Sequence, residues 1–218
     1  MNGEDADGPR LTASGWPAVD LGPREFVEQE KCMKAQVKGT AVLGTIRFIK
    51  ETFGDEGLAR ARSLLSPEDQ QRLDDTILSS AWYPVSFLLA LMKAAKKEFG
   101  AQMPDIITQI GRASADYAHT TVYKLVFKIG SPQWIISKAS VIFSSFYDVG
   151  QMVVTESGPG FANVEMRDFG EPAPEFCERI AGWIVRTFEL SGAKDIRLPQ
   201  VKCACKGDKV CRFEGTWK

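Results

Sequence analysis

The sequence lacks a long hydrophobic run. Its longest apolar stretch, VSFLLALM, ends at Lys93, well short of the ~20 residues that a membrane-spanning helix needs. The opening residues, MNGEDADGPR, are acidic and polar, whereas a secretory signal begins with basic residues and then turns apolar. We therefore expect a soluble, cytoplasmic protein with no membrane contact.

The sequence also lacks an excess of charge of one sign. Its 27 basic and 28 acidic residues give a net charge of -1, and no basic cluster stands out. Direct binding to nucleic acid requires a basic face or stripe. We therefore expect no nucleic-acid partner.

Residues and motifs for common enzyme mechanisms are scarce. The single histidine, His119, leaves little scope for a histidine-based triad, and no dinucleotide fingerprint, P-loop or nucleophile elbow is present. We interpret Glu165 and Asp168 as solvated hairpin residues and not as an acid/base pair. The sequence therefore predicts a protein that is not an enzyme.

What the sequence does have is the composition of a globular domain, with 44% hydrophobic and 25% charged residues. Residues 1–30 are rich in Gly, Pro and acidic residues, and they predict a mobile N-terminal arm. Residues 31–80 predict a helical extension, and residues 81–218 a ligand-binding domain.

Helical patterns dominate the first two thirds of the chain. Apolar residues at helical spacing precede Gly54, which predicts a helix end there, and a short amphipathic helix follows. Ser66 before Pro67 is a typical N-cap that marks another helix start. Further helices are predicted after Pro84 and over residues 104–119, 121–128 and 132–147.

After Gly150 the hydrophobic period changes from helical to alternating. QMVVTES and FANVEMRDF flank the turn SGPG, which predicts a β-hairpin. Residues 175–190 predict a helix with a broad apolar stripe, and two strands follow at about residues 196–205 and 210–217. Several helices followed by a β-β-α-β-β order predict an α+β fold, with the helices packed on one antiparallel sheet.

Three of the five cysteines crowd into the segment KCACKGDKVCRF. If residues 207–209 form a three-residue hairpin turn, Cys205 lies opposite Cys211 and Cys203 projects from the same face. A four-residue turn would put Cys211 on the other face. Cys177, in the first turn of the preceding helix, is the fourth candidate. Such thiols suit zinc, but they are also typical small buried hydrophobes, and a redox pair is a further alternative.

The end of the chain resembles the signature of the 4-vinyl-reductase domain family of small-molecule or hydrocarbon-binding domains. The matching residues are Cys203, Gly207-Asp208 and Cys211-Arg212-Phe213, and the resemblance covers roughly residues 82–217. The preceding part, from KGTAVLGTIRF to AWYP, is similar to an uncharacterised bacterial paralogous family that carries this domain. The resemblance implies helices against an antiparallel sheet, usually in a homodimer.

The resemblance also implies a metal site. Phenol-responsive members bind zinc through one helix cysteine and two hairpin cysteines, which match Cys177, Cys203 and Cys211. Their fourth ligand is acidic, and Gln200 stands at that place here, so either Cys205 substitutes or the site is altered. We predict a structural Zn²⁺ with Cys177, Cys203, Cys205 and Cys211 as its candidate ligands.

Aromatic residues are dense between residues 82 and 147, and a mostly apolar concave site is the usual design for small ligands. Each aromatic residue alone is better explained as core. Given where related sensors bind, we predict pocket walls at Tyr123, Phe127 and Trp134, with Phe143 and Tyr147 beside them. His119 does not align with the histidine of the phenol sensors, so phenol recognition is not carried over.

The leading hypothesis is a non-catalytic binding or sensory domain for a hydrophobic or aromatic small molecule. It would carry a structural zinc site and signal through a partner protein or a dimer mate. The alternative is a scaffold subunit with the fold of vesicle-tethering components and no physiological small ligand. A third hypothesis is a reductase accessory or enzyme that acts on a hydrophobic pigment.

Overall fold

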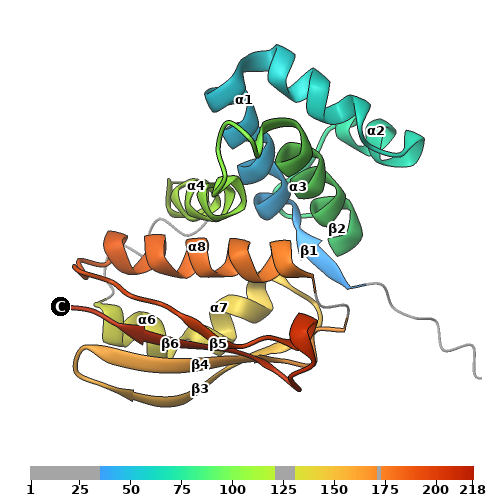
Figure 1. Ribbon diagram of the computed structural model, residues 1–218. Helices are drawn as coiled ribbons and strands as arrows, with labels where there is room; N and C mark the ends of the chain where they lie inside the picture. The colour runs from blue at the N-terminus through green and yellow to red at the C-terminus, as the bar shows by residue number, and fades with distance from the viewer. Residues whose placement is uncertain (1–34, 121–130, 171–172) are drawn as a thin grey trace, which may run out of the picture. The chain divides into compact units, whose positions relative to one another are not determined.

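Helices fill the first part of the chain and most strands the last part, as the sequence predicts (Figure 1). The computed structural model describes residues 35–120, 131–170 and 173–218. Within these ranges the chain forms seven α-helices, two antiparallel sheets and one 3₁₀ turn. The predicted α+β class is therefore confirmed.

A two-stranded ribbon introduces the first helices. Strand β1 (Gln36–Lys38) pairs with β2 (Trp82–Pro84), and each strand leads directly into a helix, α1 (Gly39–Ser63) and α3 (Val85–Phe99). Helix α1 contains a kink at Gly54, where φ is 74°. The backbone of Gly54 is not helical, with ψ at 179°, so the two helices predicted on either side of it are present and meet at this kink.

The predicted N-cap of the next helix is confirmed. Ser66 precedes α2 (Pro67–Asp74), and its hydroxyl accepts a hydrogen bond from the Asp69 N–H at 3.2 Å. This bond satisfies one of the backbone donors left open at a helix start.

Helix α4 (Ile106–Thr120) joins the N-terminal helices to α8 (Pro174–Leu190), since it contacts both α1 and α8 (Figure 1). Glycines permit its close approach to α8. A Cβ added to Gly111 would lie 2.1 Å from the Arg179 carbonyl oxygen, and one added to Gly182 would lie 2.2 Å from the Thr108 carbonyl oxygen. The predicted helix over residues 121–128 lies outside the described residues.

The single helix predicted over residues 132–147 is divided into two short ones, α6 (Pro132–Ser137) and α7 (Ala139–Phe146). Lys138 separates them, with φ −109° and ψ 6°. Its N–H turns back to the Ile135 carbonyl oxygen, a tight i→i+3 closure that ends α6. The chain therefore changes direction where the hydrophobic pattern is continuous.

The main sheet is antiparallel with the order β3-β4-β6-β5. Its strands are β3 (Gln151–Gly158), β4 (Phe161–Arg167), β5 (Gln200–Lys202) and β6 (Cys211–Thr216). The predicted β3–β4 hairpin is confirmed, with Gly160 in its turn at φ 76°. Buried residues at matching register positions, such as Val164 opposite Phe213, form one apolar face, and α6, α7 and α8 lie over this face (Figure 1).

The last hairpin differs from the expected register. The predicted strand at residues 196–205 is reduced to β5, and a 3₁₀ turn (Ala204–Lys206) follows it. The Cys203 N–H donates to the Asp208 carboxylate at 2.8 Å and not to a neighbouring strand. The three-residue turn is therefore wrong: β5 ends at Lys202, which pairs with Arg212, and Cys205 lies in the 3₁₀ turn and not opposite Cys211.

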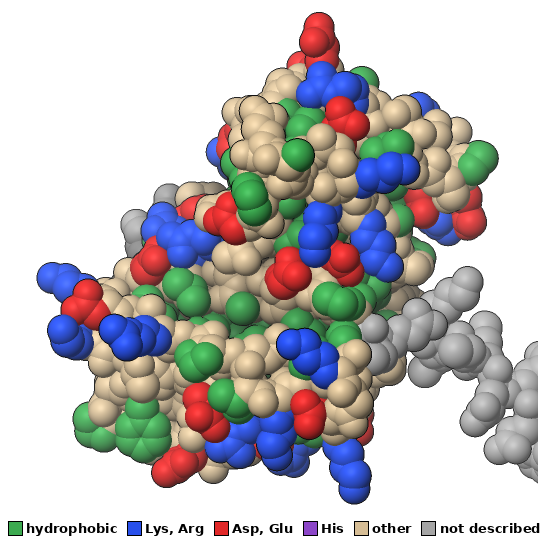
Figure 2. Space-filling view, viewed as in Figure 1, with side chains coloured by type: hydrophobic (Ala, Val, Ile, Leu, Met, Phe, Trp, Pro, Cys, Tyr) green, Lys and Arg blue, Asp and Glu red, His purple; other side chains and the backbone are tan. Residues whose placement is uncertain are grey.

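The surface shows the balanced charge of the sequence. Figure 2 shows basic and acidic side chains interspersed over the face in view. Among the described helices, none combines the length and the apolar character needed to cross a bilayer. The predicted arm at residues 1–30 lies outside the described residues, and the predicted domain boundary near residue 80 stays a prediction.

Candidate functional site: an apolar cavity with a buried arginine

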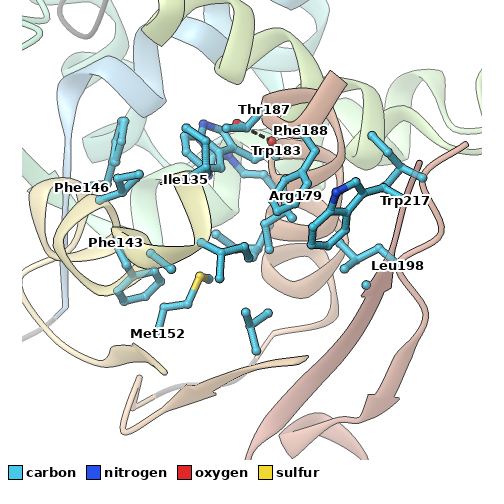
Figure 3. Close-up of a pocket in the computed structure, with 18 of the residues that line it drawn as sticks. Ile135, Phe143, Phe146, Met152, Arg179, Trp183, Thr187, Phe188, Leu198 and Trp217 are labelled. Carbon is cyan, nitrogen blue, oxygen red and sulfur yellow. Dashed lines mark hydrogen bonds between the residues drawn. The ribbon is translucent and has the colours of Figure 1, made fainter. Parts of the chain in front are cut away.

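A cavity of about 60 Å³ lies between helix α8, the inner face of the main sheet, and helices α6 and α7 (Figure 3). Its lining comes from segments far apart in the sequence, so it exists only in the folded chain. Most of the lining side chains are aliphatic or aromatic, among them Ile135, Phe143, Phe146, Met152, Val164, Ile180, Trp183, Ile184, Phe188, Leu198 and Trp217.

Helix α8 supplies one wall because its apolar stripe faces the sheet. Ile180, Ile184 and Phe188 recur at four-residue spacing, which places them on one face of the helix. Phe188 meets Trp217 edge to face, with ring centroids 4.9 Å apart. The stripe predicted from the sequence is therefore in place, and part of it borders the cavity.

Besides the indole N–H groups of its two tryptophans, the lining includes three side chains with polar groups: Tyr147, Arg179 and Thr187. Thr187 satisfies its hydroxyl within the helix, because Oγ1 donates to the Trp183 carbonyl oxygen at 2.8 Å. Arg179 is only 2% exposed, and its Nη1 donates to the Tyr147 hydroxyl at 2.8 Å. Its Nε is buried without a hydrogen-bond partner, and no ion pair involves this guanidinium within the described ranges.

Tyr147 has a neutral hydroxyl in this site. Burial raises the pKa of Tyr147, and the nearby Arg179 charge only partly opposes this rise. A neutral phenol that accepts a hydrogen bond from Arg179 still has its own proton to donate. The described residues offer no acceptor for that proton.

Only some of the predicted ligand-contact residues line the cavity. Phe143 and Tyr147 line the cavity. Trp134 is 37% exposed on α6 and is not among the lining residues. Tyr123 and Phe127 lie outside the described residues. Ligand contact by any member of this set stays a prediction.

Arg179 is a site residue that was not predicted from the sequence, although a signal was present. Arg179 lies three residues after Phe176 and four before Trp183, within the apolar stripe of α8. A charged residue at a core-facing helical position is unusual, because burying an unpaired charge is costly. The predicted stripe included only apolar residues.

A second cluster consists of thiols. The sulfur atoms of Cys177, Cys203 and Cys211 all lie within 4.8 Å of one another, and those of Cys177 and Cys211 are 3.4 Å apart. Burial, followed by hydrogen bonding to Cys211, raises the pKa of the Cys177 thiol. Cys205, half-buried in the 3₁₀ turn, is not a member of this group.

Comparisons with known proteins show which solved structures have a similar fold. No family model matches the chain, and no curated protein matches it. Solved structures of H-NOX proteins do match. The Fe(II) unliganded protein from K. algicida has a TM-score of 0.64 and 14% identity, and the match covers 83% of this chain and 96% of that one. The Fe(II)NO form from S. oneidensis has a TM-score of 0.66 and 11% identity, with 83% and 99% covered.

A third match is an oxygen-binding H-NOX domain related to soluble guanylate cyclases, in its oxygen complex. It has a TM-score of 0.56 and 11% identity, and the match covers 83% of this chain and 95% of that one. At these identities the likeness concerns the fold. This chain therefore has an H-NOX-like arrangement of helices and sheet.

These structures correct the family prediction. The chain resembles H-NOX structures and not the 4-vinyl-reductase domain, and no family model supports the latter. The matching residues have a local explanation: Gly207 adopts φ 96°, and Asp208 caps the Cys203 N–H. A tight turn alone requires such residues. The scaffold alternative, which depended on the same resemblance, gains no support.

The cofactor prediction is wrong for the same reason. A structural Zn²⁺ was implied by the 4-vinyl-reductase resemblance, whereas the matching solved structures are described with Fe(II) or heme. The thiol cluster at Cys177, Cys203 and Cys211 is nevertheless a feature of the fold. The assignment of these residues, with Cys205, as metal ligands stays a prediction.

Proposed function

We propose that this chain is a non-catalytic sensory domain that binds a small, largely apolar molecule in the cavity beside α8. Ligand occupancy would be passed to a partner protein or to a second copy of the chain. The observation that carries this proposal is the cavity itself, a partly open space lined almost entirely by apolar side chains. Concave apolar sites with few polar groups are the usual design for small-molecule recognition.

The solved structures support the same class of function. One H-NOX protein is described with NO bound and another as an oxygen complex, so this fold accommodates very small ligands in those proteins. The cavity here, at about 60 Å³, is also small. For comparison, an engineered apolar cavity of about 150 Å³ binds benzene or xenon.

Heme does not fit this cavity. A porphyrin is much larger than benzene, and the present space is below the size that holds benzene. Heme iron also needs a protein ligand such as histidine or cysteine, and neither type is among the described lining residues. Tyr147, another possible iron ligand, is instead hydrogen-bonded to Arg179. The proposed function therefore involves no heme.

The lining also argues against catalysis. General acid–base chemistry requires a titratable group near neutral pH within reach of the substrate. The described lining residues include no histidine, cysteine or carboxylate, and burial raises the pKa of Tyr147 further from neutrality. Binding without chemical conversion is the function that such a wall supports.

Xenon binding tests whether the cavity accepts a ligand. We expect xenon to shift the amide NMR signals of residues beside the cavity in the full chain, because xenon enters apolar cavities independently of polar groups. The variant Ile184→Phe adds volume at the cavity wall and is expected to abolish these shifts. Mass spectrometry under native conditions would reveal a co-purified small molecule in the wild type only.

The matched control is Ile46→Phe, the same enlargement at a half-buried position of α1 that does not line the cavity. It is expected to leave xenon binding intact. If the wild type shows no xenon-dependent shifts and carries no small molecule, the proposed function is rejected.

A further inference from the structure

We infer that the ligand of this cavity has an apolar body and a carboxylate head, and that Arg179 and Tyr147 bind the head. This inference rests on the proposed function and names the chemical class of its ligand. The juxtaposition that carries it is a buried guanidinium with an open donor at the edge of an otherwise apolar cavity.

The position of Arg179 is costly unless something compensates for it. The side chain is 2% exposed, its only described hydrogen bond goes to a neutral phenol, and its Nε is left without a partner. Buried charges in proteins are normally paired and hydrogen-bonded. A carboxylate in the cavity would supply the missing negative charge and acceptor.

The other arginines at the same helix pair show what is missing. Arg112 of α4 forms an ion pair with Glu189 at 2.7 Å. Arg186 of α8 contacts both Asp116 and Glu189, at 2.8 and 2.9 Å. These two guanidiniums are more exposed than Arg179 and yet have carboxylate partners. Arg179, the most buried of the three, has none within the described ranges.

The donors at the cavity match a carboxylate in kind. The Arg179 Nε–H and the Tyr147 O–H are both available, and charge-assisted hydrogen bonds from arginine to carboxylate are among the strong ones in proteins. Thr187 offers nothing further, because it already donates to the Trp183 carbonyl oxygen.

The other lining residues favour a ligand whose body is apolar. Ile180, Ile184, Phe143 and Met152 offer only apolar contact. Burying each methylene of an alkyl chain gains about fourfold in affinity. With a cavity of about 60 Å³, we expect short alkanoates to bind, with affinity increasing along the series until the space is filled.

Calorimetric titration of the full chain with alkanoates from acetate to hexanoate, each compared with the alcohol of equal chain length, tests the inference. We expect the best alkanoate to bind at least ~10-fold more tightly than its alcohol, since hydrogen bonds to a charged group are stronger than those between neutral groups. The variant Arg179→Met is expected to remove this preference while alcohol binding persists. Tyr147→Phe should reduce the preference about threefold or more.

Arg186→Met is the matched control, because it removes an arginine from the same helix outside the cavity. It should retain the carboxylate preference. If Arg179→Met fails to fold, Tyr147→Phe carries the test alone. The inference is overturned if the wild type binds alkanoate and alcohol with equal affinity. It is also overturned if a folded Arg179→Met variant keeps the carboxylate preference, or, where that variant does not fold, if Tyr147→Phe keeps it. If the carboxylate preference is absent but xenon binds, the proposed function is still supported. If neither xenon nor alkanoate binds, the proposed function and this inference are both rejected.

Discussion

The two sides of helix α8 are packed in opposite ways. Toward α4 the backbones come so close that Gly111 and Gly182 have no room for a Cβ. Toward the sheet and α7, the same helix leaves a cavity of about 60 Å³. The α4 side is joined by ion pairs between Arg112, Arg186 and Glu189, whereas the cavity side contains Arg179 without a carboxylate partner among the described residues.

Under the proposed function, the α4 side of this helix supports the fold and the cavity side binds the ligand. Protein interiors are normally packed to crystal-like density, so an interior space beside a well-packed contact is informative. The α4 contact stabilises the position of α8, and the open side is then available for a ligand. Binding sites are commonly less than optimal for stability, because the groups that recognise a ligand are not the groups that pack best.

The largest expected effect is on the closely packed side. Gly182→Ala would place a Cβ 2.2 Å from the Thr108 carbonyl oxygen, and the backbone would have to move. We expect the free energy of unfolding to fall by about 2 kcal/mol or more, measured by urea denaturation. Gly192→Ala, which adds a Cβ in open space at φ 96°, is the control and should cost only about 1 kcal/mol. Equal losses would show that the α4–α8 contact is not tight.

An opposite effect is expected on the cavity side. The double variant Arg179→Met/Tyr147→Phe replaces both partners of a buried polar pair with apolar side chains of similar shape. Without ligand, we expect its free energy of unfolding to rise by about 1 kcal/mol, since an uncompensated buried charge is removed. Thermal and urea denaturation would measure this. A loss of stability would mean that Arg179 is structural and that the two sides of α8 serve the same purpose.

The smallest effect concerns the rim of the α4–α8 contact. Hydrogen bonding from Arg112, followed by Arg186, lowers the pKa of Glu189 despite partial burial. A lowered pKa stabilises the fold above the ordinary value of 4.5, and this stabilisation is lost as the pH falls through the folded-state pKa. Glu189→Gln should therefore cost up to about 1 kcal/mol at pH 7, and the difference from the wild type should shrink in acid.

The control for this variant is Glu56→Gln, at an exposed position of α1 outside the described ion pairs. It should leave the denaturation midpoint unchanged at both pH values. A pH-independent difference for Glu189→Gln would show that packing, and not charge, accounts for the role of this residue.

Local elements were predictable where one period or one cap dominates. The Ser66 cap, the β3–β4 hairpin and helix α8 all follow from neighbouring residues, and each is confirmed. The division of one predicted helix into α6 and α7 at Lys138 was not predictable, because the apolar pattern continues through this residue. The predicted register of the final hairpin was wrong. The Cys203 N–H donates to the Asp208 side chain and not to a neighbouring strand.

The candidate site was less predictable than the fold. The meeting of Cys177 with Cys203 and Cys211 was anticipated and is observed as geometry, but its interpretation through a structural zinc and a 4-vinyl-reductase resemblance was wrong. Short motifs around a turn mostly report the conformation of that turn. They were too local to identify a fold that this chain shares with solved structures at 11–15% identity.

By itself the sequence determined the order and type of the elements, the α+β class and the apolar stripe of α8, because periodicity and capping act over a few neighbouring residues. Only the tertiary structure decided that the stripe borders a cavity and that Arg179 is buried against Tyr147. Burial and pairing of a charge depend on segments more than thirty residues apart in the chain. A local pattern contains no information about which distant side chain will lie opposite.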